Sequence, residues 1–438
     1  MRPRARALSA ILGILLLGAA CTSGSEASDD GVPTSPEVAL SPADGPGSAL
    51  AAQRRLCTIP RPRTGGGSEV PPEGPTPPAI ARVMDQVEQI RGFDFTERVV
   101  AEAVGPQAIA DGFAESLDAS YPAELFERRS LAWQTIGVIA EGTSIRDELL
   151  EFGGTQVIGF YNTLTGELKF IGTDDPSPFD RVTLAHELTH AIDDQRFGLE
   201  RLDFLGAACR DEELEAMIGL VEGNATYFML RWAQTFLSPA EQVELSAEAA
   251  QQAAPGDLDP FVESTQAWPY TAGFRFVTAL EQDGGNAAVD AALEDPPIST
   301  EQVMHPERYP NDVPVPVDVP DLAPALGQGW EDLDVQDVGE MWLDEALRLR
   351  LGDGESDTAA AGWDGGIYRA WSDRGRVAVV LATAWDSDRD AEEFAVAMRH
   401  WIEASAQAAT VPPPDGSSVR VLFASDPGTL RALETAAG

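Results

Sequence analysis

The sequence predicts an α+β protein with a mostly helical body, a small β-hairpin within that body, and a small C-terminal α/β part. Apolar residues recur at helical spacing through most of the chain from about residue 80 to residue 350. Near residue 160 the pattern changes to two short strand-like runs joined by a turn. After residue 365, strand-like runs alternate with helical ones, which predicts a second, smaller α/β part.

The first 78 residues predict a leader and a tether. Residues 1–20 are typical of a signal peptide, because three arginines precede an apolar run that is too short to span a membrane comfortably. Cys21 follows three small residues, as in the lipobox of bacterial lipoproteins, and is the predicted lipidation site. We therefore expect an exported lipoprotein on the outer side of the cell membrane, with plain secretion as the alternative. Residues 21–78 are rich in Ser, Gly and Pro and predict a flexible tether.

The charge balance excludes some partners. The chain has 72 acidic and 30 basic residues, for a formal net charge of -42. Nucleic acid would be repelled, and so would an anionic lipid surface, so we expect no nucleic-acid partner and attachment to the membrane only through the N-terminal lipid. Cys57 and Cys209 remain once Cys21 is assigned to lipid, and in an exported chain they predict one disulfide.

The elements follow in order from residue 79, where we place the start of the larger folded domain, which ends at residue 350. Residues 351–438 form the predicted C-terminal subdomain. Several helices are expected up to residue 140, and strands at 156–162 and 167–172 form the hairpin. Further helices are expected at 180–195, 211–235, 239–254, 265–282 and 338–351. The C-terminal subdomain is expected to contain strands at 366–371, 377–384 and 419–424, and helices at 388–404 and 428–437.

The helix at 180–195 carries a candidate metal site in the motif HExxH. His186 and His190 are four residues apart, so one helical face presents both imidazoles, and imidazole nitrogen is a preferred zinc ligand. Glu187 follows the first histidine and could activate a zinc-bound water as a general base. A catalytic zinc site needs a third protein ligand.

Glu222 is the strongest candidate for that ligand. It lies on the next predicted helix within an otherwise apolar stretch, where an unpaired carboxylate would be unfavourable. Its neighbours Gly223 and Ala225 are small and would allow this helix and the HExxH helix to approach each other closely. The rivals form an acidic cluster that is typical of a solvated helix start: Asp211, Glu212, Glu213 and Glu215.

Taken together, HExxH on one helix and a Glu on a following helix resemble the gluzincin branch of zinc metallopeptidases. The HELTH run, with Asp194 four residues after the second histidine, is similar to the active-site helix of thermolysin-like enzymes. The chain also resembles a group of largely uncharacterised bacterial and archaeal surface proteins over about residues 80–350, through these stretches: 159–162, 186–195, 221–225 and 297–306.

The resemblance implies a zincin-like fold in which His186, His190 and Glu222 bind one zinc ion and Glu187 activates the water. It also implies that the strand at 167–172 is an edge strand, along which an extended peptide substrate would bind. The chain departs from the family at Thr226, where thermolysin-like enzymes have an Asp that orients a histidine ligand. Asp193, Asp194 or Asn224 could take that role.

The sequence leaves the oxyanion stabiliser open among three residues, His305, Tyr270 and Tyr227. A structural hydrogen bond is the competing interpretation of His305. The leading function is a membrane-tethered zinc metallopeptidase that hydrolyses peptide bonds. Two alternatives stay open: a surface binding or scaffold protein with little or no catalysis, and a metal-dependent hydrolase of cell-wall amide bonds.

Overall fold

The computed structural model describes residues 47–59, 76–252 and 258–437. The predicted signal peptide, Cys21 and most of the predicted tether lie outside these residues. Within them the protein is a mixed α+β structure with two separate sheets, a three-stranded one and a five-stranded one. None of the helices in this part of the chain is long and apolar enough to cross a membrane.

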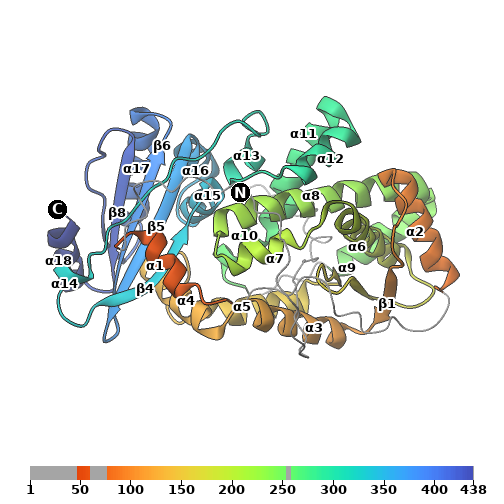
Figure 1. Cartoon of the computed structure of the whole chain (residues 1–438), viewed down its shortest axis with the longest axis horizontal. Helices are drawn as coiled ribbons and strands as arrows, with labels where there is room; N and C mark the ends of the chain where they lie inside the picture. The colour runs from red at the N-terminus through yellow and green to blue at the C-terminus, as the bar shows by residue number, and fades with distance from the viewer. Residues whose placement is uncertain (1–46, 60–75, 253–257, 438) are drawn as a thin grey trace, which may run out of the picture.

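Helices make up the larger part of the molecule, on the right in Figure 1, and the five-stranded sheet lies at the other end beside the C-terminus. The first group of helices is α2 (Pro78–Arg91), α3 (Pro106–Ser120), α4 (Ala123–Ile136), α5 (Ile145–Thr155), α6 (Pro178–Phe197), α7 (Arg201–Ala207) and α8 (Asp211–Phe236). The second group is α9 (Pro239–Gln252), α10 (Pro260–Trp268), the π-helical η2 (Pro269–Gly273), α11 (Phe274–Gly284), α12 (Asn286–Glu294) and α13 (Thr300–Met304).

The small sheet confirms the predicted hairpin but corrects its place in the sheet. The strands β1 (Val100–Val104), β2 (Gly159–Tyr161) and β3 (Glu167–Ile171) are ordered β1-β3-β2. β3 is therefore the central strand, parallel to β1 and antiparallel to β2, and the expectation that it is an edge strand is wrong. β1 lies in a stretch for which the sequence predicted only helices, and its pairing covers the edge of β3.

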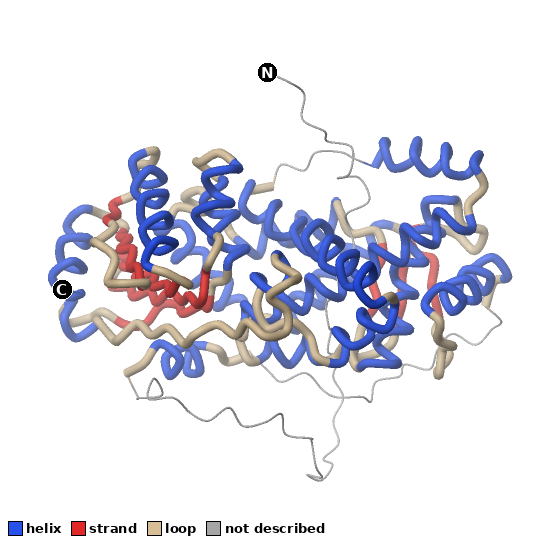
Figure 2. The backbone as a smooth tube through the Cα atoms, turned by 90° about the horizontal axis from the view of Figure 1, so that it is seen from above, coloured by secondary structure: helices blue, strands red, loops and turns tan. Residues whose placement is uncertain are grey.

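The five-stranded sheet is antiparallel and has helices on both faces (Figure 2). Its strands β4 (Glu331–Asp337), β5 (Trp363–Asp373), β6 (Arg376–Trp385), β7 (Ala408–Thr410) and β8 (Ser418–Ala424) are ordered β4-β5-β6-β8-β7. Because successive side chains alternate between faces, Val379 and Leu381 join the core shared with α4, whereas Val380 and Ala382 face the opposite core. The remaining helices are α14 (Ala323–Leu326), α15 (Glu340–Arg348), α16 (Asp353–Ala360), α17 (Asp388–Glu403) and α18 (Pro427–Ala437).

The two parts share one hydrophobic core, and the first strand of the C-terminal sheet lies before the predicted boundary at residue 350. β4 begins at Glu331 and pairs with β5, which places the start of the C-terminal sheet inside the predicted larger domain. Trp133 of α4, Phe261 of α10 and Trp342 of α15 pack edge to face at the junction. The sheet is therefore packed onto the helical body by aromatic side chains.

Residues 47–59 correct the predicted extent of the tether, because they form the ordered helix α1 (Ala49–Leu56), which lies along β4 (Figure 1). Ser48 caps the helix, and Gln53 donates a hydrogen bond to the Cys209 carbonyl at 2.9 Å. The predicted disulfide between Cys57 and Cys209 is confirmed. It joins the end of α1 to the segment between α7 and α8.

Candidate metal centre

Helix α6 holds the HExxH motif in the interior of the helical body. Ser177 begins the helix with a capping box in which its hydroxyl accepts from the Asp180 backbone N–H and the Asp180 carboxylate accepts from the Ser177 backbone N–H. The helix is buried on almost all sides between α2, α8, α9 and the small sheet. His186, Glu187 and His190 are each at most 1 % exposed, so no bulk water competes for their polar atoms.

Helix α8 brings Glu222 to the two histidines, as the sequence predicted. Glu222 Oε2 lies 3.2 Å from His186 Nε2 and 3.5 Å from His190 Nε2, and the two Nε2 atoms are 2.9 Å apart. The three ligand atoms lie within 4.8 Å of one another, and all three residues are buried. A buried group of two imidazoles and one carboxylate in this arrangement could hold a metal ion.

The unsatisfied polar atoms and the charge states of these groups also fit a metal. Glu222 Oε1 and His186 Nδ1 are buried and have no hydrogen-bond partner in the described part of the chain. Burial lowers the pKa of His186 to about 4, which favours the neutral imidazole. Burial alone would raise the pKa of Glu222, but His190 and His186 bring it down to about 2, which favours the carboxylate. Neutral imidazole and charged carboxylate are the forms that bind metal.

The rival carboxylates lie at the start of α8, away from this group. Asp211 pairs with Arg129, Glu212 accepts from the Thr300 backbone, and Glu213 pairs with Arg210. Glu215 faces a separate cavity. The structure thus brings together the set that the sequence favoured and leaves the others outside it.

Glu187 lies between the metal centre and strand β2. A Cβ atom on Gly159 would be 3.0 Å from Glu187 Oε1, so a larger residue at this place in β2 would crowd the carboxylate. Neither Glu187 oxygen accepts a hydrogen bond of normal geometry within the described residues. Burial and then the charge of Glu222 raise the pKa of Glu187 well above its usual value, while the Tyr161 backbone opposes the shift. The raised pKa favours the protonated carboxyl, so this site promotes proton uptake by Glu187.

A buried ion-pair network fixes α6 against α2 and α8. The Arg91 side chain, fully buried, contacts Asp193 at 2.7 Å and Asp290 at 2.7 Å, and its guanidinium lies 4.8 Å from the ring centre of Phe228. Asn224 donates to the second Asp193 oxygen. Since Asp193 is three residues after His190 and Asn224 is two after Glu222, this network holds together the two helices that carry the ligands.

The three residues considered as substitutes for the Asp expected at position 226 make different hydrogen bonds. Asp193 and Asn224 bond to each other, whereas Asp194 accepts from the Tyr161 hydroxyl at 2.8 Å and from the Leu199 backbone at 2.7 Å. The Thr226 hydroxyl is buried and has no hydrogen-bond partner in the described part of the chain. Thr226 thus makes no hydrogen bond to a histidine ligand there, and it does not replace the expected Asp.

Sequence reasoning missed the π-helical turn η2 that packs on α8 beside the metal centre. A Cβ on Gly223 would lie 2.1 Å from the Gly273 carbonyl carbon, and one on Gly273 would lie 1.9 Å from the Gly219 oxygen, so the backbones touch. η2 places the buried Tyr270 ring 6.3 Å from the His186 ring, centre to centre. Such π-helical turns are frequent at functional sites. Pro269 inside a helical pattern could have indicated an irregular turn here, because proline cannot donate the usual helical hydrogen bond.

The other two oxyanion candidates have partners elsewhere. His305 Nε2 lies 2.9 Å from Glu340 Oε1 of α15, and this hydrogen bond raises the pKa of His305. Tyr227 packs against Phe228 and Phe274. The structure thus places neither of them in the His-His-Glu group, and the structural interpretation of His305 fits its contact with Glu340. Tyr270 is the candidate that the fold places beside a histidine of that group.

Comparison with known proteins finds a match only for the C-terminal part of the chain. A family model described as a domain of unknown function, DUF8575, matches residues 329–433. That range contains all five strands of the larger sheet and none of the metal-centre residues. No curated protein and no solved structure matches the chain. The match also supports placing the start of the C-terminal part near β4 rather than after residue 350.

Proposed function

We propose that the protein is a zinc metallopeptidase with a zincin-like catalytic body. One observation supports this most strongly: two buried imidazoles and one buried carboxylate converge, and the Glu187 carboxylate lies beside them without a hydrogen-bond partner of normal geometry in the described chain. Nitrogen and oxygen ligands of this kind suit zinc, and three protein ligands are typical of catalytic rather than structural zinc sites.

His186, His190 and Glu222 would hold the zinc ion. When bound, zinc supplies Lewis acidity, which lowers the pKa of water and polarises the carbonyl group of the scissile bond. Glu187 would take a proton from the attacking water and later deliver it to the leaving amine. Its burial and its proximity to Glu222 favour proton uptake, because both raise its pKa. Tyr270 would donate its hydroxyl hydrogen to the developing oxyanion.

Strand β2 replaces the strand at 167–172 as the proposed binding edge for an extended peptide. β2 is at the end of the sheet order, and Gly159 within it contacts Glu187. A peptide that added to this edge would bring its backbone past the general base. We propose a peptide or protein substrate for this reason.

We further propose that the enzyme works outside the cytoplasm, attached through lipid on Cys21 or secreted. The disulfide between Cys57 and Cys209 supports this, because such bonds persist in oxidising compartments. The substrate would then be an extracytoplasmic peptide or protein.

The test is a metal analysis of the purified protein followed by digestion of a peptide library. We expect one zinc per chain and cleavage by the unaltered protein. Glu187→Gln should keep the zinc and lose cleavage by about 100-fold or more, since general-base catalysis contributes about 10²–10⁴-fold. Glu213→Gln is the matched control, because it changes an acid to an amide on α8 outside the metal centre. Full cleavage by Glu187→Gln, or no bound metal, would refute the proposal.

A further inference from the structure

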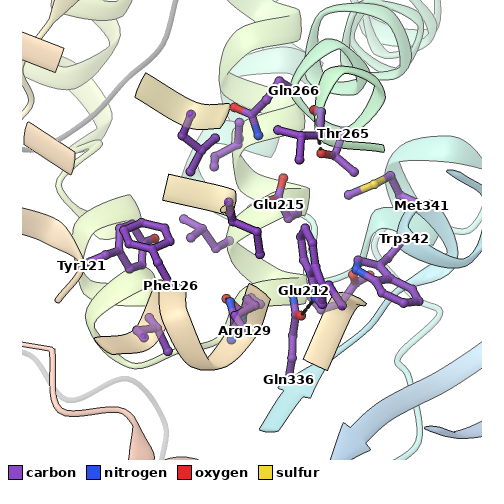
Figure 3. A pocket seen from close by; sticks show the side chains of 18 of the residues that line it. Tyr121, Phe126, Arg129, Glu212, Glu215, Thr265, Gln266, Gln336, Met341 and Trp342 are labelled. Atoms are coloured by element: carbon purple, nitrogen blue, oxygen red, sulfur yellow. Dashed lines mark hydrogen bonds and ion pairs between the residues drawn. The ribbon is translucent and has the colours of Figure 1, made fainter. Parts of the chain in front are cut away.

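A second candidate site is a cavity of about 170 Å³ at the junction of the helical body and the C-terminal sheet. Its lining residues come from α3, α4, α5, α8, α10, β4 and α15, and Figure 3 shows most of their side chains. None of the metal-centre residues lines it. The cavity is therefore separate from the proposed peptidase chemistry, although it shares helix α8 with it.

Most of the cavity wall is apolar. Phe126, Trp133 and Trp342 supply aromatic surface, and Leu149, Ile218 and Val262 supply aliphatic surface. Water inside such walls finds few partners, so an apolar chain would be favoured over water there. An engineered apolar cavity of about 150 Å³ holds benzene, so this one has room for a group of about six heavy atoms.

The charged groups of the wall are already paired, with one exception. Arg129 contacts Asp211 at 3.0 Å and Asp334 at 3.4 Å, so its positive charge is neutralised. The Glu212 carboxylate accepts two hydrogen bonds from Thr300. The Asp337 carboxylate accepts from Gln53 and from the backbone N–H groups of Asp211 and Glu212.

Glu215 is the exception, because no hydrogen bond or ion pair to its carboxylate occurs among residues 47–59, 76–252 and 258–437. In Figure 3 it lies centrally among the lining side chains, between Gln266 and Thr265 above and Glu212 and Gln336 below. Burial and the nearby Asp211 raise its pKa to about 7, against the opposing effect of Arg129. A cation beside Glu215 would offset the free-energy cost of burying its charged carboxylate.

We propose that this cavity binds a primary ammonium group on a short apolar chain, with Glu215 as the counter-ion. The aromatic and aliphatic walls would hold the chain, and the carboxylate would accept a charge-assisted hydrogen bond from the ammonium. The same chemistry belongs to a free alkyl amine and to the lysine side chain of a peptide. The volume of the cavity suits both, since each places about five or six heavy atoms in it.

The test is calorimetric titration of the whole protein with three probes that share one alkyl chain: pentylamine, 1-pentanol and pentanoate. Pentylamine should bind about 10-fold or more tightly than 1-pentanol, because a hydrogen bond to a charged group adds that much affinity. Pentanoate should bind most weakly, since Glu215 would repel it. This series needs no variant, so it stands whether or not a substitution is tolerated. Equal affinity for pentylamine and 1-pentanol would overturn the proposal.

A pair of variants tests the counter-ion itself. Glu215→Gln keeps the size of the side chain and should reduce pentylamine affinity to that of 1-pentanol, whose own affinity stays the same. Glu213→Gln makes the same chemical change on the same helix, at a side chain that pairs with Arg210, and should leave both affinities unchanged. Unaltered pentylamine binding by folded Glu215→Gln would contradict the assignment.

A further arm separates the two sources of the ammonium group. Binding of Nα-acetyl-lysine amide with the same dependence on Glu215 would assign the cavity to a lysine side chain of a peptide. Binding of pentylamine without the lysine derivative would assign it to a free amine. Because the cavity contains none of the metal ligands, these titrations do not depend on whether the protein cleaves peptides.

Discussion

Replacing Gly223 by alanine tests whether the contact between α8 and η2 positions the metal centre. The new Cβ would lie 2.1 Å from the Gly273 carbonyl carbon, whereas ordinary contacts begin at 3.4 Å, so the two backbones must separate by about 1.3 Å, which is 3.4 minus 2.1. The obstacle is backbone, which cannot rotate away as a side chain could. Overpacking typically costs about 1–3 kcal/mol. Alanine recovers about 1 kcal/mol through helix propensity, so we expect a net loss of stability of up to about 2 kcal/mol.

The same separation would move Tyr270 away from His186. A misplacement of about 1 Å at a catalytic group can lower the rate about 100-fold. We therefore expect kcat for peptide cleavage to fall by about that factor in Gly223→Ala. Zinc content should be preserved, because His186, His190 and Glu222 come from α6 and α8 and none of them is on η2.

The assays are urea unfolding followed by circular dichroism, and peptide cleavage at fixed zinc content. Gly154→Ala is the matched control: Gly154 is also in a helix, α5, and a Cβ there meets nothing within 4 Å. It should raise stability by about 0.5–1 kcal/mol, since glycine is unfavourable within helices, and leave activity unchanged. If both alanine variants shift stability and kcat alike, the backbone contact does not position the site and the reasoning is refuted.

Three further predictions follow from buried groups. Arg91→Met leaves the buried Asp193 without its cation and should lower the free energy of unfolding by about 3–5 kcal/mol; a change below about 1 kcal/mol in urea unfolding would contradict this. Glu215 has a pKa of about 7 in the folded protein against 4.5 for the free group, so the native state retains a proton that the unfolded chain releases. Stability should therefore fall as the pH rises from about 4.5 to about 7, by about 1–3 kcal/mol from this half-buried group. Glu215→Gln should flatten that part of the profile, and parallel profiles for variant and unaltered protein would exclude the effect. Replacing both Cys57 and Cys209 by serine opens a loop of 152 residues and should cost up to about 5 kcal/mol, measured as a lower urea midpoint; an unchanged midpoint would show that the bond adds no stability.

The sequence was most informative where a local rule links residues that are near one another in the chain. The i, i+4 spacing of His186 and His190 follows from helix geometry alone, and the hairpin at 159–171 follows from alternation and its turn. Glu222 could be predicted because a lone carboxylate in an apolar helix needs a partner. The disulfide could be predicted because an exported chain with two remaining cysteines has one simple pairing.

The sequence failed where the outcome depends on contacts between distant segments. The position of β3 in the sheet depended on β1, which lies more than sixty residues earlier, and no local pattern in β3 reveals that partner. Helix α1 is ordered because it packs on β4 and is joined to Cys209, and both are far along the chain from it. His305 was a candidate oxyanion stabiliser, but packing of α13 against α15 gave it Glu340 as its partner.

The sequence by itself therefore determined the ligand set of the candidate metal centre, because helical spacing and the cost of burying charge act within short segments. Only the tertiary structure decided which strands form the edges of the small sheet, which tyrosine lies beside His186, and that Glu215 faces a cavity. The first depends on the pairing of β1 and β2 with β3, the second on how η2 packs against α8, and the third on how α8 meets the helices at the junction. Packing is a property of several segments at once, and no single segment specifies it.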